Sequence, residues 1–308
     1  MTVETMDEAS AKGPATRLTP ALRAMLWMAA SGVAFTALNT LMKWLAHDMD
    51  PFQVGFLRYF FGFVVMVPVG LRIGLAACRT SSLGLHVVRN AFHSAGMLCW
   101  FFALPMATMA DMTAIGFTGP IFICLGAVLF LGERMTGARW LAVLVGFAGV
   151  LTVVRPWEPG AMSGVGFGNV MLLCASPLFA GSFLLAKVLT RHERSDSIVL
   201  WQHGLVSLFC LPFAWVNWTA PTPLQWGLFV VCGILGAGGH YLLTRAFKAA
   251  DISASQSVRF LDLIWAAIGG FMVFGSVPGV WTVAGAAIIF SSTLWLARHE
   301  AQARAMAK

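Results

Sequence analysis

Residues 117–156 read FTGPIFICLGAVLFLGERMTGARWLAVLVGFAGVLTVVRP and contain two long apolar segments joined by a short polar turn. The turn follows Leu131 and carries the charged residues Glu133 and Arg134. A helix of about 20 apolar residues is long enough to cross a lipid bilayer. This stretch therefore predicts a pair of membrane-spanning helices with a charged turn at one membrane surface.

The composition of the whole chain extends this prediction to a class of protein. Hydrophobic residues make up 58% of the 308 residues and charged residues 11%, and the mean hydropathy is +0.79. Soluble domains carry about 25% charged residues, so a soluble enzyme, a disordered chain and a secreted disulfide-rich protein are all excluded. We expect an all-α integral membrane protein, because alternating barrel strands are absent from the sequence.

Ten apolar segments follow one another along the chain, and the connections between them are short. The expected spans are 24–46, 53–72, 88–107, 111–131, 138–154, 164–187, 197–217, 224–247, 254–274 and 279–297. We expect residues 1–23 and 299–308 to form cytoplasmic tails. The spans group into two sets of five, over 24–156 and 164–298.

The positions of the 20 Lys and Arg residues indicate the orientation of these spans. With the N-terminus placed in the cytoplasm, only Lys43 and Arg155 fall on the outer side, and Arg58 and Arg259 fall within spans. The remaining basic residues, with Arg89 counted among them, lie on the inner side, as the positive-inside rule requires. We therefore expect a multi-pass inner-membrane protein with both termini in the cytoplasm. Nucleic acid is not an expected partner, because the net charge of +7 is dispersed over loops.

An internal repeat accompanies the ten spans. A shift of 143 residues pairs 103–155 with 246–298, with identities that include Phe117 with Phe260 and Gly126 with Gly269. Five spans per half is an odd number, so the two halves must have opposite orientations in the membrane. Inverted repeats recur in secondary transporters, whose substrate sites lie near the midplane where the halves meet.

The segment 117–156 resembles the repeat of the EamA family, in the drug/metabolite transporter superfamily. The resemblance rests on Pro120, on the turn from Leu131 to Arg134 and on the glycine-bearing fifth span, and it extends to residues 42–62 (MKWLAHDMDPFQVGFLRYFFG). The second half departs from it, with Leu263 and Ser276 at the positions of the proline and the glutamate.

This resemblance implies a ten-helix basket around a cavity lined mainly by spans 1, 3, 4, 6, 8 and 9. It also implies a carrier of small metabolites, and bacterial exporters of aromatic or neutral amino acids are the nearest described type. We therefore expect amino-acid export by alternating access. The alternatives are import or facilitated passage of another small metabolite, such as a nucleoside, sugar or drug-like solute, and a channel-like protein.

Charged residues inside a bilayer are costly and need a reason to be there. Arg259 and Asp262 lie three residues apart in span nine and therefore on one helix face. They are candidates for holding an amino-acid substrate, and the alternative is a structural ion pair that lets Arg259 reach the membrane surface.

Further cavity candidates are the histidines His93 and His240, which titrate near neutral pH or donate hydrogen bonds, together with Tyr241, Asn39 and the aromatic Trp100 and Phe117. For each, packing between helices is the alternative.

Other polar and small residues have expected roles in packing or gating. Arg58 and Gln202 are expected to be structural, and His203 is a further polar group beside Gln202 in span seven. Glycine and proline residues in spans four and eight have two possible roles. They could let these helices bend at a gate, or they could allow close helix packing. The residues are Gly116, Gly119, Pro120 and Gly239.

An enzyme is not expected, because the sequence lacks the GxSxG and HExxH motifs and paired catalytic carboxylates. There is no P-loop, so ATP is not expected as the direct energy source. The six cysteines have no CxxC spacing, so neither a disulfide framework nor a metal site is expected, and no cofactor. The expected partners are a small-molecule substrate and the lipid bilayer, with the protein acting as a monomer or weak homodimer.

Overall fold

The computed structural model describes residues 19–74, 78–103, 115–116, 118–154, 157, 167–262, 264–265, 268, 272 and 279–305. All regular secondary structure in these residues is helical. The helices are α1 (Pro20–Leu45), α2 (Pro51–Ile73), α4 (Leu83–Ala103), α6 (Gly119–Leu131), α7 (Gly137–Val154), α8 (Phe167–Leu189), α9 (Ser195–Val216), α10 (Pro223–Ala249), α11 (Ser253–Gln256), the 3₁₀ helix η1 (Ser257–Phe260) and α13 (Val280–Ala305).

Several helix ends differ from the expected boundaries, and local chemistry explains two of them. Helix α1 begins at Pro20 because the Thr19 hydroxyl accepts a hydrogen bond from the Leu22 amide at 3.1 Å and proline suits the first helical turn. Arg23 is thus helical although we expected it in the tail. Helix α13 continues to Ala305 into the expected C-terminal tail, since its last residues are rich in the helix formers Ala, Arg, Glu and Gln.

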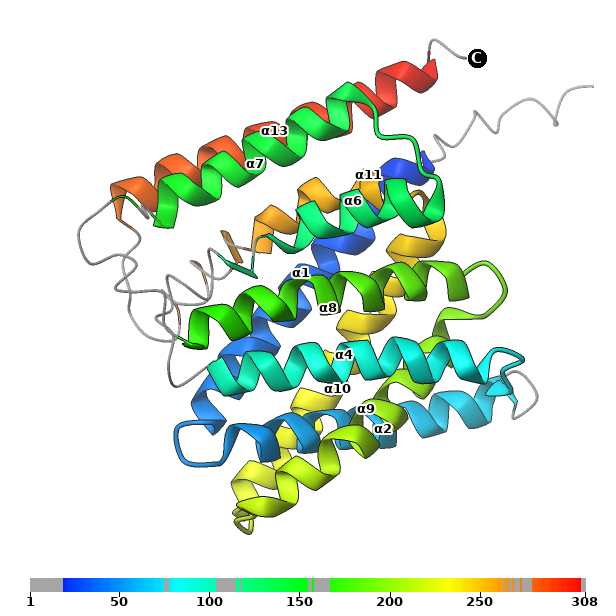
Figure 1. Ribbon diagram of the computed structural model, residues 1–308, viewed down its shortest axis with the longest axis vertical. Helices are drawn as coiled ribbons and strands as arrows, with labels where there is room; N and C mark the ends of the chain where they lie inside the picture. Colours follow the sequence, from blue (N-terminus) through cyan, green and yellow to red (C-terminus); the bar gives the residue numbers. More distant parts are fainter. Residues whose placement is uncertain are drawn as a thin grey trace, which may run out of the picture.

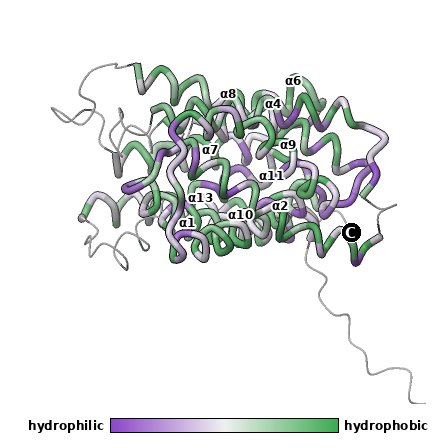
Figure 2. Tube along the Cα trace, turned by 90° about the horizontal axis from the view of Figure 1, so that it is seen from below, coloured by the Kyte–Doolittle hydropathy of each residue, from purple (hydrophilic) through white to green (hydrophobic). Residues whose placement is uncertain are grey.

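Five of the described helices are long and apolar enough to cross a membrane, namely those over Pro20–Met42, Pro51–Ile73, Val170–Leu189, Ser195–Val216 and Pro223–Ala249. Figure 2 shows that hydrophobic residues dominate most of the trace, while hydrophilic ones gather towards one end and in short stretches inside. The apolar helices thus form the body of the molecule.

The helices pair across the two halves of the sequence. The most extensive contacts join α1 to α10, α4 to α8, α7 to α13 and α2 to α9. Figure 1 shows α7 beside α13 at one edge of the bundle and α2 with α9 towards the opposite edge.

Two large apolar cores and three smaller ones lie among the described residues. One large core includes Met28 of α1, Phe183 of α8 and Phe247 of α10, and the other includes Leu38 of α1, Leu57 of α2 and Phe229 of α10. The partly buried rings of Phe35 and Phe179 pack against both cores and so mark the zone between them.

Two charged side chains join helix ends at one end of the bundle. The Glu133 carboxylate accepts hydrogen bonds from the Ile252 amide at 2.9 Å and the Ser253 amide at 3.1 Å, at the start of α11. The Lys187 ammonium donates to the carbonyls of Phe247 at 2.6 Å and Ala250 at 2.5 Å, at the end of α10. An anion at a helix start and a cation at a helix end are both stabilising. The turn after Leu131, which carries Glu133, therefore connects the first half of the chain to α11 in the second half.

Candidate functional site

A stripe of polar residues runs along one face of α4. His86, Arg89, Asn90 and His93 recur at helical spacing and are all buried. Arg89 had been counted with the loops, but it lies in the second turn of α4 and is only 1% exposed. Its guanidinium faces α9, where Nη2 donates to Oε1 of Gln202 at 2.8 Å. Arg89 is therefore part of the interior and is not a loop cation.

Three rings from three helices meet next to this stripe. The Tyr59 hydroxyl of α2 shares a hydrogen bond with Nε2 of His93 at 2.6 Å and lies 3.5 Å from Nε2 of His240 in α10. The second ring nitrogen of His93 lies 3.3 Å from the Ser182 hydroxyl of α8. His93 and His240, which are both predicted site residues, are thus brought together around Tyr59.

Further polar side chains complete the group. Gln202 of α9 extends its amide nitrogen to within 3.3 Å of Nδ1 of His240, and Arg58 Nη2 lies 3.5 Å from Nε2 of the same ring. His203 bonds the Val199 carbonyl at 2.9 Å through Nδ1, and its ring lies 5.4 Å from that of His240. We call the following seven residues the central polar cluster: Arg58, Tyr59, Arg89, His93, Gln202, His203 and His240.

Several polar atoms of this region are buried without a hydrogen-bond partner among the described residues. They are Nε of Arg58, Nε and Nη1 of Arg89, both amide atoms of Asn90 and Nε2 of His203. Leaving such a group unpaired in an apolar interior costs about 1–3 kcal/mol, and more when it is charged. A polar solute or water molecules that paired with them would recover this free energy.

Aromatic rings surround the cluster. Phe35 of α1 meets the His240 ring edge-on at 4.9 Å, and Phe179 of α8 meets His93 in the same manner at 5.2 Å. Gly62 makes room for His203, because a Cβ at Gly62 would lie 2.1 Å from its ring. The region therefore combines hydrogen-bonding groups with ring faces and edges.

The predicted pair Arg259 and Asp262 lies next to this region. The Arg259 guanidinium carbon is 5.2 Å from the centre of the Phe183 ring, which itself lies 6.2 Å from the His93 ring. The Asp262 carboxylate lies against α1, where a Cβ at Gly32 would come within 2.1 Å of it. Both residues are half-buried, and the ion pairs found among the described residues do not join them to each other.

Other predicted cavity residues lie apart from the cluster. Asn39 is on the exposed side of α1. Tyr241 accepts a hydrogen bond from Arg245 at 3.2 Å, and Trp100 meets Phe101 edge-on at 5.1 Å. Phe117 lies outside the described residues.

Of the predicted gating residues, Pro120 lies at a helix start and Gly239 lies in a close contact with a ring. Pro120 is in the first turn of α6, where its missing N–H needs no intrahelical partner, so it does not interrupt that helix. Gly116 and Gly119 have no described atom within 4 Å of an added Cβ, whereas at Gly239 the ring of Phe35 would be 3.0 Å away.

Sequence reasoning missed Tyr59, Arg89 and Asn90 as site residues, assigned Arg58 and Gln202 to structural roles, and left His203 without an assigned role. The polar stripe of α4, with its helical spacing in an otherwise apolar span, is the signal that could have found two of them. Among the residues that the structure describes, no group of three or more His, Cys, Asp or Glu side chains could hold a metal ion.

Comparisons with known proteins identify the family. Residues 22–155 and 166–298 each match the EamA-like transporter family. A riboflavin transporter of Rhizobium johnstonii is 34% identical over 278 residues, which cover 89% of this chain and 91% of that protein. An S-adenosylmethionine uptake transporter of Rickettsia bellii is 29% identical, with 90% and 94% covered.

Two more distant matches agree with this assignment. A pseudopaline exporter of Pseudomonas aeruginosa is 25% identical, with 86% of this chain and 92% of that protein covered. A solved crystal structure with 16% identity superposes with a TM-score of 0.75 over 90% of this chain and 98% of the other, and so shares the fold.

These matches confirm the predicted family and the prediction that the protein is not an enzyme, but the relatives described above are not named as amino-acid exporters. The chain is therefore an all-helical, multi-pass membrane protein with two EamA domains, and it belongs to the EamA-like transporter family.

Proposed function

We propose that this transporter takes up a neutral heteroaromatic metabolite that carries several hydroxyl groups, of the kind that riboflavin represents. The observation that carries the proposal is the central polar cluster, in which unpaired donors lie among aromatic rings. A flavin offers a flat ring for stacking, carbonyl oxygens for the Arg and His donors, and hydroxyls for the remaining polar groups. Two riboflavin transporters, at 34% and 31% identity, support the same substrate class.

The charge of the cluster separates this substrate from S-adenosylmethionine. Arg58 and Arg89 both lie in the cluster, and none of its seven residues carries a carboxylate. S-adenosylmethionine carries a sulfonium and an ammonium group, which two guanidinium groups without a carboxylate in the cluster would repel. A neutral solute avoids this repulsion.

The amino-acid export expected from the resemblance fits this site less well. A zwitterionic amino acid needs an anionic partner for its ammonium group, and Asp262 lies against α1 beside Gly32 rather than within the cluster. Import as the direction of transport is also supported by the relative that is named an S-adenosylmethionine uptake transporter, and the riboflavin transporter supports the substrate class.

The proposed architecture is ten spans in two inverted halves, with both termini in the cytoplasm and transport by alternating access. The basic residues of the loops support this orientation. The helix pairs support the two-fold relation, because exchanging corresponding helices of the two halves converts the α1–α10 pair into the α8–α4 pair and leaves α7–α13 and α2–α9 unchanged. The central polar cluster lies where the halves meet, since α2 and α4 come from the first half and α9 and α10 from the second.

Uptake of labelled substrates into liposomes that contain the purified protein tests the substrate. We expect riboflavin to accumulate above the level in empty liposomes, and unlabelled riboflavin to compete better than S-adenosylmethionine or phenylalanine. Accumulation of either competitor in the absence of riboflavin transport would overturn the proposal. Growth of a riboflavin-requiring bacterial strain that expresses the protein tests the direction, because only an importer lowers the riboflavin needed in the medium.

A further inference from the structure

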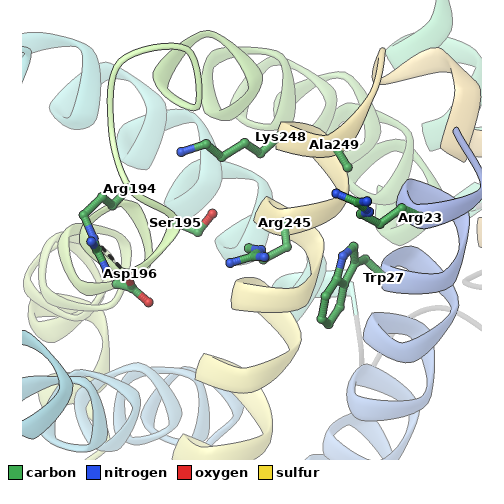
Figure 3. Close-up of a pocket in the computed structure, with 8 residues that line it drawn as sticks. All are labelled: Arg23, Trp27, Arg194, Ser195, Asp196, Arg245, Lys248 and Ala249. Atoms are coloured by element: carbon green, nitrogen blue, oxygen red, sulfur yellow. Dashed lines mark hydrogen bonds and ion pairs between the residues drawn. The ribbon is translucent and has the colours of Figure 1, made fainter. Parts of the chain in front are cut away.

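A second polar site lies at the end of the bundle where α1 begins and α10 ends. Its cavity of about 390 Å³ is large enough for a small ligand or a lipid headgroup. Figure 3 shows side chains from α1, the start of α9 and the end of α10 around it. It is lined by Arg23, Trp27, Arg194, Ser195, Asp196, Arg245, Lys248 and Ala249, and we call it the basic pocket.

The positive charges of the basic pocket exceed its negative charge by three. The Asp196 carboxylate is paired with Arg194 at 3.0 Å. Arg245 contacts the Tyr241 hydroxyl at 3.2 Å and lies 5.5 Å above the Trp27 ring, while Lys248 reaches the Glu193 carbonyl at 3.4 Å. Among the described residues, neither Arg245 nor Lys248 has a carboxylate partner.

The start of α9 adds a second, independent feature. Arg194 occupies the N-cap position without a capping side-chain hydrogen bond, and the first amide bonded within the helix is that of Ile198, to the Arg194 carbonyl. The preceding amides of this 22-residue helix have no intrahelical acceptor, as at any helix start, so they are able to donate to an anion.

The Ser195 side chain points at the same place. It is only 5% exposed, and its hydroxyl has no partner among the described residues. Figure 3 shows this hydroxyl directed towards the space between Arg245 and Lys248. A buried hydroxyl that lacks a partner and faces two cations indicates a missing acceptor.

We propose that the basic pocket binds a phosphate group, as a monoester or a diester. Phosphate presents several acceptor oxygens and negative charge, which match the helix start, the Ser195 hydroxyl and the cations Arg23, Arg245 and Lys248 together. The phosphate belongs either to the headgroup of an anionic phospholipid, for which basic pockets between membrane helices are suited, or to a soluble phosphorylated metabolite. This site is separate from the central polar cluster and does not depend on the transported substrate.

Binding to the purified, full-length protein tests the proposal with two probes. Glycerol 3-phosphate is titrated onto protein in phosphatidylcholine nanodiscs, and phosphatidylglycerol binding is followed by native mass spectrometry. The variants are Arg245→Gln and Ser195→Ala. The matched control is Arg72→Gln, which removes the same charge from an exposed position in the last turn of α2.

We expect at least one probe to bind, about tenfold weaker in Arg245→Gln and several-fold weaker in Ser195→Ala, with no change in Arg72→Gln. Binding of glycerol 3-phosphate alone assigns the site to a soluble metabolite, and binding of phosphatidylglycerol alone assigns it to lipid. Failure of both probes to bind, or equal weakening in the control, overturns the proposal. Thermal unfolding of each variant verifies that it is folded, and riboflavin uptake is measured separately, so the two proposals fail independently.

Discussion

Glu133 and Lys187, which are partly buried at helix ends, and the buried arginines of the central polar cluster differ in their hydrogen-bond partners. Glu133 and Lys187 each bond two backbone groups at helix ends. In the cluster, Arg58 and Arg89 keep unpaired nitrogen atoms. A charge whose hydrogen bonds go to the backbone of a helix end stabilises the fold, whereas a buried charge with unpaired donors can pair with a solute. This difference predicts a structural role for Glu133 and Lys187 and a role in transport for Arg58 and Arg89.

Among these substitutions, we expect Arg58→Gln to have the largest effect on transport. It removes the guanidinium that lies 3.5 Å from His240 and has a free Nε. A hydrogen bond to a charged group is worth about 1.5–3 kcal/mol, so we expect riboflavin uptake to fall by about 10- to 100-fold. The thermal midpoint of the purified protein should change little, because Arg58 is incompletely bonded. A large loss of stability at unchanged uptake per folded molecule would place Arg58 with the structural charges.

The two tyrosines of the chain give a matched pair of substitutions. Tyr59→Phe removes the hydroxyl that joins His93 and His240, and we expect uptake to fall by about tenfold for the loss of roughly 1.4 kcal/mol. Tyr241→Phe removes a hydroxyl that contacts only Arg245 among the described residues, and it should transport like the wild type. Initial uptake rates in liposomes measure both, and equal rates for the two variants would contradict the assignment of the cluster.

Glu133→Gln should have the smallest effect, and on stability alone. The neutral amide retains one acceptor oxygen for the two amides at the start of α11, so we expect a loss of about 1 kcal/mol. Chemical or thermal unfolding of the detergent-solubilised protein measures this change. Uptake per folded molecule should stay at the wild-type level, and a selective loss of uptake would show that this contact has a role in transport.

The fold was largely predictable, whereas the candidate site was predictable only in part. Apolar length alone identified the helices, and the family resemblance placed Glu133 in a turn with a recognisable pattern. The structure brings His93 and His240 together, and both are cavity candidates chosen from the sequence as polar residues in apolar spans. Asn39 and Tyr241 satisfied the same criterion, yet they lie apart from the cluster.

Arg89 illustrates why the remaining residues escaped prediction. Its position near the start of a span suited a loop cation, but the helix begins six residues earlier, at Leu83, and turns Arg89 towards Gln202. Tyr59 escaped selection although Tyr241 was selected, because only its hydrogen-bond partners distinguish Tyr59 from Tyr241. Those partners are 34 and 181 residues away in the chain.

The sequence by itself determined that this protein is a helical membrane protein, because hydrophobicity and span length are properties of single segments, and its resemblance to the EamA family indicated a transporter. Only the tertiary structure decided which polar residues meet. That outcome depends on the rotation of each helix about its axis and on its neighbours across the bundle. Packing brings residues of the two halves together: Arg58, Tyr59 and His93 from the first half meet Gln202 and His240 from the second. Neither half contains this cluster alone.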